Sequence, residues 1–194
     1  MQDRFFIIVY FCGVIVGTVL RSWYTRAYRT NTIVSENRSR LDSVLMVIPA
    51  FGMLILPLVY AFSDMLNFAD YRLSPWAGWV GTAQFTGGLV LLWRSHADLG
   101  SNWSPSVQIR EGHTLVTHGV FKRIRHPMYA AHFLWGCAQP LLLQNWIAGF
   151  SMLVTLVPLM LVRVPREERM MLERFGEEYR SYMRRTVRGL PFFR

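Results

Sequence analysis

A long stretch of this chain without a charged residue, 128–162, places the strongest limit on its fold. It contains 35 consecutive residues with no Asp, Glu, Lys or Arg. A helix needs about 20 mostly apolar residues to cross a bilayer, so this stretch is too long for one crossing and just long enough for two short ones. Gln139-Pro140 and Gln144-Asn145 lie near its middle, where a polar turn is expected. The stretch therefore predicts a transmembrane hairpin.

Three further charge-free stretches precede the hairpin. They cover 5–20, 43–62 and 76–93, which are 16, 20 and 18 residues long. The first reaches spanning length if Arg4 and Arg21 extend their charged groups toward the lipid headgroups. No small-x-small cleavage site follows it, so a retained span is favoured over a cleaved signal peptide. With 52% hydrophobic and 17% charged residues, the sequence predicts an all-α membrane protein with five transmembrane helices.

Charge is distributed unevenly between the two sides that five spans define. Segments 21–42, 94–127 and 163–194 share one side and hold 19 basic and 9 acidic residues, a net charge of +10. Segments 1–4 and 63–75 and the hairpin tip share the other side, with a net charge of −1. The positive-inside rule places the first side in the cytoplasm. The expected membrane is the cell membrane in a prokaryote or the endoplasmic reticulum in a eukaryote, and the basic character needs no nucleic-acid partner.

The chain divides into two parts by the distribution of its polar residues. Residues 1–93 carry three expected spans, whereas 94–194 hold nearly all polar side chains suited to chemistry. Gly13 and Gly17 form a small-xxx-small pattern, for which a contact within the molecule is favoured over a dimer seam; the oligomeric state itself stays open. Residues 166–185 have apolar positions at three- and four-residue steps, which predicts an amphipathic interfacial helix with a bend at Gly176.

Two polar motifs are delivered to the same mouth of the expected hairpin. The first, Arg125-His126-Pro127-x-Tyr129, begins one helix, and Pro127 suits the first helical position. The second, Arg163-x-x-x-Glu167, closes the other helix and places both side chains on one face. A basic anchor and a surface ion pair are the structural alternatives. A cation at the end of an apolar span, however, is costly unless it has a partner, which favours a functional site.

Several classes of site are excluded by what the sequence lacks. The spacings of His113, His118, His126 and His132 match no metal-ligand pattern, so no metal is expected. No glycine-rich dinucleotide motif or Walker loop is present. The 34 residues of 94–127 are too few for a soluble nucleotide-binding domain. A nucleotide-like cofactor must therefore be held by this loop, the hairpin and the C-terminal helix.

The C-terminal half contains a series of short motifs in this order: Ser-x-Trp at 101–103, Val107-Gln108, His113-Thr-Leu-Val116, Gly119-Val-Phe121, Arg125-His-Pro-x-Tyr129, Glu167-Glu168, Phe175-Gly-Glu-Glu-Tyr179 and Gly189-Leu-Pro-Phe192. Through these motifs, residues 101–194 resemble the isoprenylcysteine carboxyl methyltransferase family, whose members are integral membrane enzymes that use S-adenosyl-L-methionine.

The resemblance implies a role for particular residues. Arg163 is implied as the catalytic contact to the substrate carboxylate. The implied cofactor contacts are Gln108, His113, Thr114, Leu115, Val116, Phe121, His126, Pro127, Met128, Tyr129 and Glu167. Phe121 stands where the family often has Tyr, so a hydroxyl role is lost there. The three spans before this region are fewer than in larger members, which leaves the substrate range open.

The implied reaction is transfer of a methyl group to the carboxylate of a prenylated C-terminal cysteine or a similar lipid-like carboxylate. The partners would be this lipid-modified substrate and the membrane lipids. Three alternatives stay open. A phospholipid N-methyltransferase acts on an amine, which would not favour Arg163. A sterol-reductase-like enzyme would bind NADPH, and a non-enzymatic multispan subunit would bind no cofactor.

Overall fold

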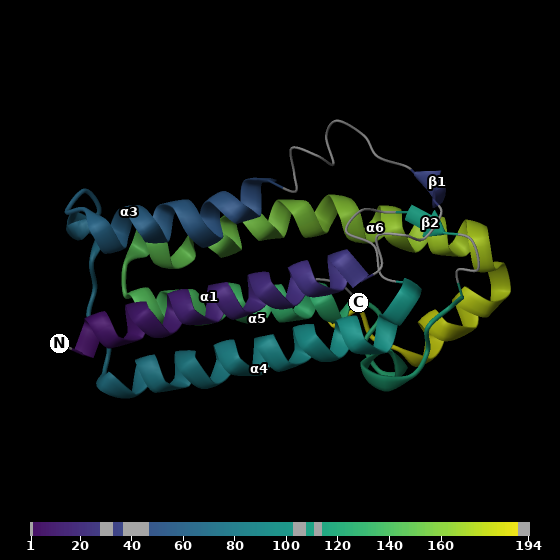
Figure 1. Cartoon of the computed structure of the whole chain (residues 1–194), viewed down its shortest axis with the longest axis horizontal. Helices are drawn as coiled ribbons and strands as arrows, with labels where there is room; N and C mark the ends of the chain where they lie inside the picture. The colour runs from purple at the N-terminus through teal and green to yellow at the C-terminus, as the bar shows by residue number, and fades with distance from the viewer. Residues whose placement is uncertain (1, 28–32, 37–46, 103–107, 111–113, 190–194) are drawn as a thin grey trace.

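The protein is described here by a computed structural model, which covers residues 2–27, 33–36, 47–102, 108–110 and 114–189. It is mostly helical, as predicted, with long helices running side by side (Figure 1). The main helices are α1 (Gln2–Ala27), η1 (Phe51–Ile55) continuing into α3 (Leu56–Phe62), α4 (Pro75–Leu99), α5 (Pro127–Leu143) and α6 (Trp146–Arg185). Short 3-10 turns are η2 (Asn67–Ala69), η3 (Gly100–Asn102) and η4 (Gly119–Lys122).

Each charge-free stretch of the sequence overlaps a helix of the described residues, and the longest one forms two. Helix α4 is 25 residues long and extends beyond the predicted loop start at residue 94, as far as Leu99. Two helices, Arg4–Arg26 and Trp146–Arg185, are long and apolar enough to cross a membrane, and Val47–Phe62 is a shorter apolar helix. Large apolar side chains also face outward along α1 and α4, including Ile8, Ile15, Val19, Trp76 and Val80.

The core lies where α5 packs between α4 and α6, with α1 against α4 and α5. The two glycines of α1 permit this close approach. A Cβ added at Gly13 would meet the ring of Phe85, and one added at Gly17 would meet that of Trp135. These two rings stack with centroids 5.1 Å apart. The predicted contact within the molecule is therefore confirmed for this glycine pair.

The turn of the hairpin is at Gln144-Asn145, one of its two predicted positions. Gln144 adopts a left-handed conformation, and the Asn145 side chain caps α6 by accepting from the backbone N–H groups of Ile147 and Ala148 at 3.0 and 2.9 Å. The Asn145 amide nitrogen also donates to the Asp70 carboxylate at 2.8 Å. The other polar pair near the middle of the stretch, Gln139-Pro140, lies inside α5, where buried Gln139 donates to the Gly52 carbonyl at 3.1 Å.

Segments that the charge count assigned to one side meet at one end of the bundle. Strand β1 (Ile33–Glu36) pairs antiparallel with β2 (Gln108–Arg110), so a small two-stranded sheet adds to the predicted all-helical fold. An isolated bridge joins Ile124 to Val187. At the opposite end, Asp70 forms a bridge to Asn145. These connections therefore lie in two groups, one at each end of the bundle.

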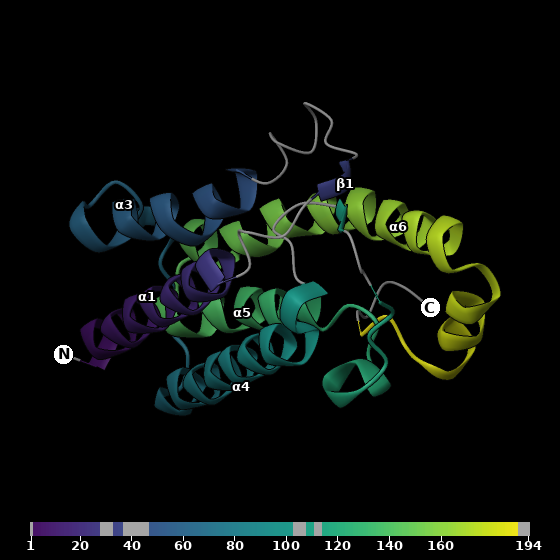
Figure 2. The same ribbon diagram turned by 45° about the vertical axis from the view of Figure 1, so that its right-hand side comes forward.

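Helix α6 bends sharply in its last third. Gly176 has φ 52° and ψ −121°, outside the helical region, which confirms the predicted bend. The chain then turns back toward the bundle as a short C-terminal arm, residues 177–189 (Figure 2). Tyr182 of the arm donates from its hydroxyl to the Phe121 carbonyl at 2.7 Å. The bend thus brings the arm against the loop that precedes α5.

Candidate functional site

The antiparallel hairpin brings the start of α5 and the charged part of α6 to the same end of the bundle. His126 has a non-helical conformation (φ −123°, ψ 59°) and Pro127 occupies the first position of α5, as expected for a residue before proline. On α6 the apolar stretch ends at Arg163, and Glu167 and Glu168 follow one turn later. Polar groups from both helices therefore meet where the C-terminal arm folds back.

Glu168 is the centre of one polar cluster at this end. Its carboxylate is 3% exposed and accepts hydrogen bonds from Arg125 Nε at 3.2 Å and from Arg188 Nε at 2.9 Å. The Nε2 atom of His126 lies 3.3 Å from the same carboxylate. Two arginines and one histidine thus converge on a single buried carboxylate, and Arg188 contributes from the arm.

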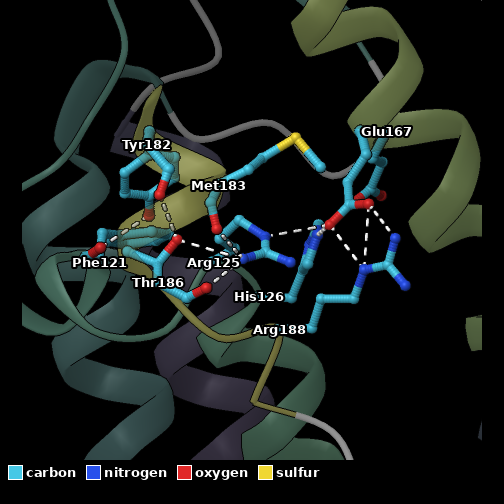
Figure 3. Close-up of polar contacts among 9 residues, drawn as sticks. Phe121, Arg125, His126, Glu167, Tyr182, Met183, Thr186 and Arg188 are labelled. Carbon is cyan, nitrogen blue, oxygen red and sulfur yellow. Dashed lines mark hydrogen bonds and ion pairs between the residues drawn. The ribbon is translucent and has the colours of Figure 1, made fainter. Parts of the chain in front are cut away.

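Arg125 connects this carboxylate to the arm backbone. Its Nη1 donates to the carbonyl oxygens of Met183, at 3.1 Å, and Thr186. Figure 3 shows Arg125 between Thr186 and Tyr182 on one side and His126 and Glu167 on the other. The guanidinium therefore links the beginning of α5, the middle of α6 and the end of the arm.

The charge of this cluster controls the protonation of Glu168. Burial alone would raise the pKa of its carboxyl group, but hydrogen bonds from His126 and Arg188, and their charges, lower the pKa far below its usual range. Glu168 is therefore ionised under all ordinary conditions. An ionised carboxylate bound by several donors from different segments is suited to hold those segments together.

Glu167 belongs to a second polar cluster on the adjacent face of α6. Its Oε1 accepts from the Tyr129 hydroxyl at 2.6 Å and lies 3.3 Å from Arg163 Nη2. Its Oε2 lies 3.7 Å from Nδ1 of His126. The Glu167 side chain keeps 23% of its surface exposed, so a ligand at this end of the bundle can reach it.

Arg163 is buried, with 8% of its surface exposed, although it carries a full positive charge. One guanidinium nitrogen pairs with Glu167, whereas its buried Nε has no hydrogen-bond partner within the described part of the chain. A buried N–H of a charged group that lacks a partner costs free energy. The arrangement is therefore suited to accept an anion beside Glu167.

The structure brings part of the predicted cofactor set together. His126, Tyr129 and Glu167 are in mutual contact, with buried Pro127 and half-buried Met128 between the first two in sequence.

Thr114, Leu115, Val116 and Phe121 lie in the loop before α5. Thr114 is exposed and donates from its backbone to Asn102 Oδ1 at 2.9 Å, Leu115 is half-buried, and Val116 and Phe121 are each 8% exposed. Gln108 lies in β2, and its side chain is outside the described part of the structure. His113 lies outside the described residues.

The loop before α5 is tied to the end of α4. Asp98 accepts from the backbone N–H of Val120 at 2.8 Å and pairs with Arg94 at 3.1 Å. Gly119, with φ +55°, lets the backbone pass the Asp98 carboxylate, since an added Cβ would approach it to 2.0 Å. These contacts fix the loop from 114 to 122 against the bundle.

Three residues of the polar end had no role in the sequence-based prediction: Arg125, Glu168 and Arg188. Arg125 and Glu168 occur inside motifs that were recognised, next to residues that were assigned a role. Arg188 lies 20 residues beyond its partner Glu168 in sequence. Among the described residues, no group of three His, Cys, Asp or Glu side chains lies in a position to hold a metal ion.

Comparison with known proteins gives a consistent result for this region. Residues 80–173 match the model of the isoprenylcysteine carboxyl methyltransferase (ICMT) family. The human protein-S-isoprenylcysteine O-methyltransferase is 35% identical over 145 residues, which cover 70% of this chain and 51% of the human protein. Protein-S-isoprenylcysteine O-methyltransferase B of Arabidopsis thaliana is 29% identical over 145 residues, which cover 74% of this chain and 73% of the plant protein.

The fold also matches a solved structure. The eukaryotic intramembrane Ras methyltransferase ICMT superimposes with a TM-score of 0.54 at 27% identity, covering 79% of this chain and 52% of that chain. This chain thus spans about half the length of the human relative and of the solved structure. Residues 80–173, which match the family model, include Arg125, Glu167 and Glu168 of the two polar clusters.

Proposed function

Because the chain belongs to the isoprenylcysteine carboxyl methyltransferase family, we propose that it is a protein-S-isoprenylcysteine O-methyltransferase-like enzyme. The reaction is transfer of a methyl group from S-adenosyl-L-methionine to the carboxylate of a prenylated C-terminal cysteine or a similar lipid-like carboxylate. The product is a methyl ester. The matched region, 80–173, contains His126, Tyr129, Arg163 and Glu167.

The observation that carries this proposal is the state of Arg163. Its guanidinium is buried at the end of the apolar part of α6, and its Nε lacks a partner among the described residues. A guanidinium presents several N–H groups in a fixed plane that matches the two oxygens of a carboxylate. Arg163 is therefore suited to bind the acceptor carboxylate and to orient it, whereas an amine acceptor would gain nothing from this cation.

The chemistry asks little of the protein beyond positioning. A carboxylate is ionised near neutral pH and already nucleophilic, so the chain needs no general base to generate it. When bound, S-adenosyl-L-methionine supplies an electrophilic methyl group on a sulfonium. The residues of the site have to hold the acceptor in line and exclude water, and good positioning can contribute about 7–11 kcal/mol.

The residues that would hold the methyl donor lie on the loop before α5 and on the two facing helices. We assign this role to Gln108, His113, Thr114, Leu115, Val116, Phe121, His126, Pro127, Met128, Tyr129 and Glu167. The contact of Tyr129 and His126 with the partly exposed Glu167 supports the assignment, because a carboxylate held this way can accept hydrogen bonds from hydroxyl groups of a ligand.

The proposed membrane arrangement has five spans, with the N-terminus outside and the C-terminus and active site in the cytoplasm. Residues 1–93 would form the three N-terminal spans and 94–194 the catalytic region. Two helices of spanning length, outward apolar side chains and the meeting of the basic connections at one end support it. A lipid-borne acceptor would then enter from the membrane, and the polar methyl donor from the cytoplasm.

The test is methyl-ester formation by the detergent-purified protein on a farnesylated cysteine. Arg163→Ala should lower turnover tenfold or more, because removing a hydrogen bond to a charged group costs about 1.5–3 kcal/mol. Its affinity for S-adenosylhomocysteine should stay near that of the wild type. Arg163→Lys should restore activity only in part, since a point charge does not reproduce the fork.

Arg169→Ala is the matched control, since Arg169 is an exposed arginine on the same helix, and it should leave turnover unchanged. Wild-type turnover by Arg163→Ala would remove the assigned role of Arg163. Methylation of amine lipids with no ester formed by the wild type would show a phospholipid N-methyltransferase instead. Calorimetric binding of NADPH without S-adenosylhomocysteine binding would show a reductase.

A further inference from the structure

The inner face of α1 carries Arg21, a cation to which the proposed reaction assigns no role. Gly17 contacts the Trp135 ring, and the ring of Tyr24 lies 5.1 Å from that of His96 on α4. Arg21 lies one turn after Gly17 and one turn before Tyr24, so it shares this inward face. It is half-buried. Arg21 therefore points toward α4 and α5. The sequence alone instead predicts that its charged group extends toward the lipid headgroups.

The positive charge of Arg21 interacts with that of Arg163 on α6, and it also acts on Tyr129 of α5. The charge of Arg21 also acts on His96 of α4 and His132 of α5. Arg21 from α1 and Arg163 from α6 thus both act electrostatically on Tyr129.

Among the described residues that act on Tyr129, positive charge exceeds negative charge. Their carboxylate is that of Glu167, which already accepts from Tyr129 and pairs with Arg163. The buried Nε of Arg163 has no partner within the described residues. Two guanidinium groups beside one carboxylate, between apolar helices, leave one uncompensated positive charge, which is costly away from water. A bound anion with a single negative charge would remove this cost.

We propose that Arg21 is a second residue that binds the acceptor carboxylate, opposite Arg163. This inference rests on the proposed function and adds the α1 helix to the acceptor site. One carboxylate oxygen would receive hydrogen bonds from Arg163 and the other from Arg21. Holding both oxygens fixes the plane of the carboxylate, and with it the direction in which the attacking oxygen points. The free acid would be selected over an amide or an ester of the same lipid.

The test compares Arg21→Ala, Arg21→Gln and Arg21→Lys with Arg26→Ala, which replaces an exposed arginine near the end of the same helix. Initial rates are measured against the concentration of N-acetyl-farnesylcysteine. The alanine and glutamine variants should raise KM by about tenfold or more, as expected for a lost hydrogen bond between charged groups. The lysine variant should be intermediate, and Arg26→Ala should match the wild type.

Two binding measurements separate a carboxylate contact from a packing role. N-acetyl-farnesylcysteine amide has no carboxylate, so its inhibition constant should be unchanged in Arg21→Ala while binding of the acid weakens. The affinity for S-adenosylhomocysteine, measured by calorimetry, should stay within about twofold of the wild type and also reports folding. If the alanine variant does not fold, the same comparison with the lysine variant decides.

Three results would overturn the inference and leave the proposed function in place. An unchanged KM for the acid removes the acceptor role of Arg21. Equal weakening of acid and amide shows a packing role. A loss of S-adenosylhomocysteine affinity with an unchanged KM shows that Arg21 binds the carboxylate of the methyl donor. A wild-type protein that forms no methyl ester defeats the proposed function itself, and the acceptor role of Arg21 with it.

Discussion

Glu168→Ala should destabilise the protein strongly without removing any group that binds the acceptor. The change deletes a carboxylate that is 3% exposed and leaves Arg125, whose side chain is 5% exposed, without its counter-charge. Removing one partner of a buried ion pair typically costs about 3–5 kcal/mol. Because Arg188 is partly exposed, the loss of its pair with Glu168 adds little to this cost. Arg125 retains its bonds to the arm, which limits the cost further. The lower end, about 3 kcal/mol, is therefore expected.

Thermal unfolding in detergent, followed by circular dichroism, measures this loss. For a chain of this size each kcal/mol corresponds to about 2–4 °C, so the melting temperature should fall by about 6–12 °C. Glu177→Ala is the matched control, because Glu177 pairs with Arg180 at 2.6 Å with both side chains mostly exposed, and exposed pairs contribute about 0–1 kcal/mol. If both variants melt within about 2 °C of the wild type, the Glu168 cluster does not hold the arm to the bundle.

Three other expectations concern single side chains. Tyr129→Phe removes the hydroxyl that donates to Glu167 and should weaken S-adenosylhomocysteine binding in calorimetry by about tenfold. Unchanged binding would exclude a role of the Tyr129 hydroxyl in holding the methyl donor. The pKa of Glu168 is lowered in the fold, so its stabilisation is complete above the unfolded value of about 4.3 and is lost as the pH falls below it; melting temperatures should therefore drop from pH 5 to pH 3 more steeply in the wild type than in Glu168→Gln. Asn145→Ala loses a helix cap and the bonds to segment 63–75 and should cost about 2–3 kcal/mol in the same melting assay, whereas Asn145→Ser, which retains a capping oxygen and places no second carboxylate beside Asp70, should cost less.

The positions of the helices could be predicted because the physical limit is simple. A charge-free stretch of given length either spans once, spans twice or is too short, and 128–162 fitted two helices. The sequence offered two polar pairs near the middle of this stretch, Gln139-Pro140 and Gln144-Asn145, and did not decide which of them forms the turn. Gln139 faces the carbonyl of Gly52 on a helix far away in sequence, so its inward position depends on tertiary packing that no local pattern contains.

The roles of Glu167 and Glu168 could not be separated from the sequence. Neighbouring residues of a helix point about 100° apart, so the two carboxylates serve different clusters. One accepts from Tyr129, and the other binds Arg125 and Arg188. Which of them faces the arm depends on the direction that the chain takes after its bend, and that direction is set by contacts made 20 residues later.

Arg21 shows a signal that was present in the sequence and was assigned differently. Its place at the end of a charge-free stretch suggested an arginine that extends to the headgroups. Its position along the helix indicates an inward side chain instead. Arg21 follows Gly13 and Gly17 at intervals of four residues, on the face of α1 that packs against Phe85 and Trp135. A small-residue face marks the inner side of a membrane helix, and this inward position of a cation is the basis for the acceptor role that we propose for Arg21.

The bend at Gly176 lets the arm return to the bundle, where Tyr182 and Arg188 make their contacts. With φ 52° and ψ −121° the residue occupies a region that other amino acids adopt only at a cost of about 1–3 kcal/mol, although nothing lies within 4 Å of an added Cβ. Gly176→Ala should therefore destabilise the arm through the backbone. Gly87→Ala also adds a methyl group in open space, but in a regular helix, where alanine is favoured by about 0.5–1 kcal/mol. Melting temperatures should thus move in opposite directions, down for Gly176→Ala and up for Gly87→Ala. A rise in both would mean that the arm does not depend on a glycine at the bend.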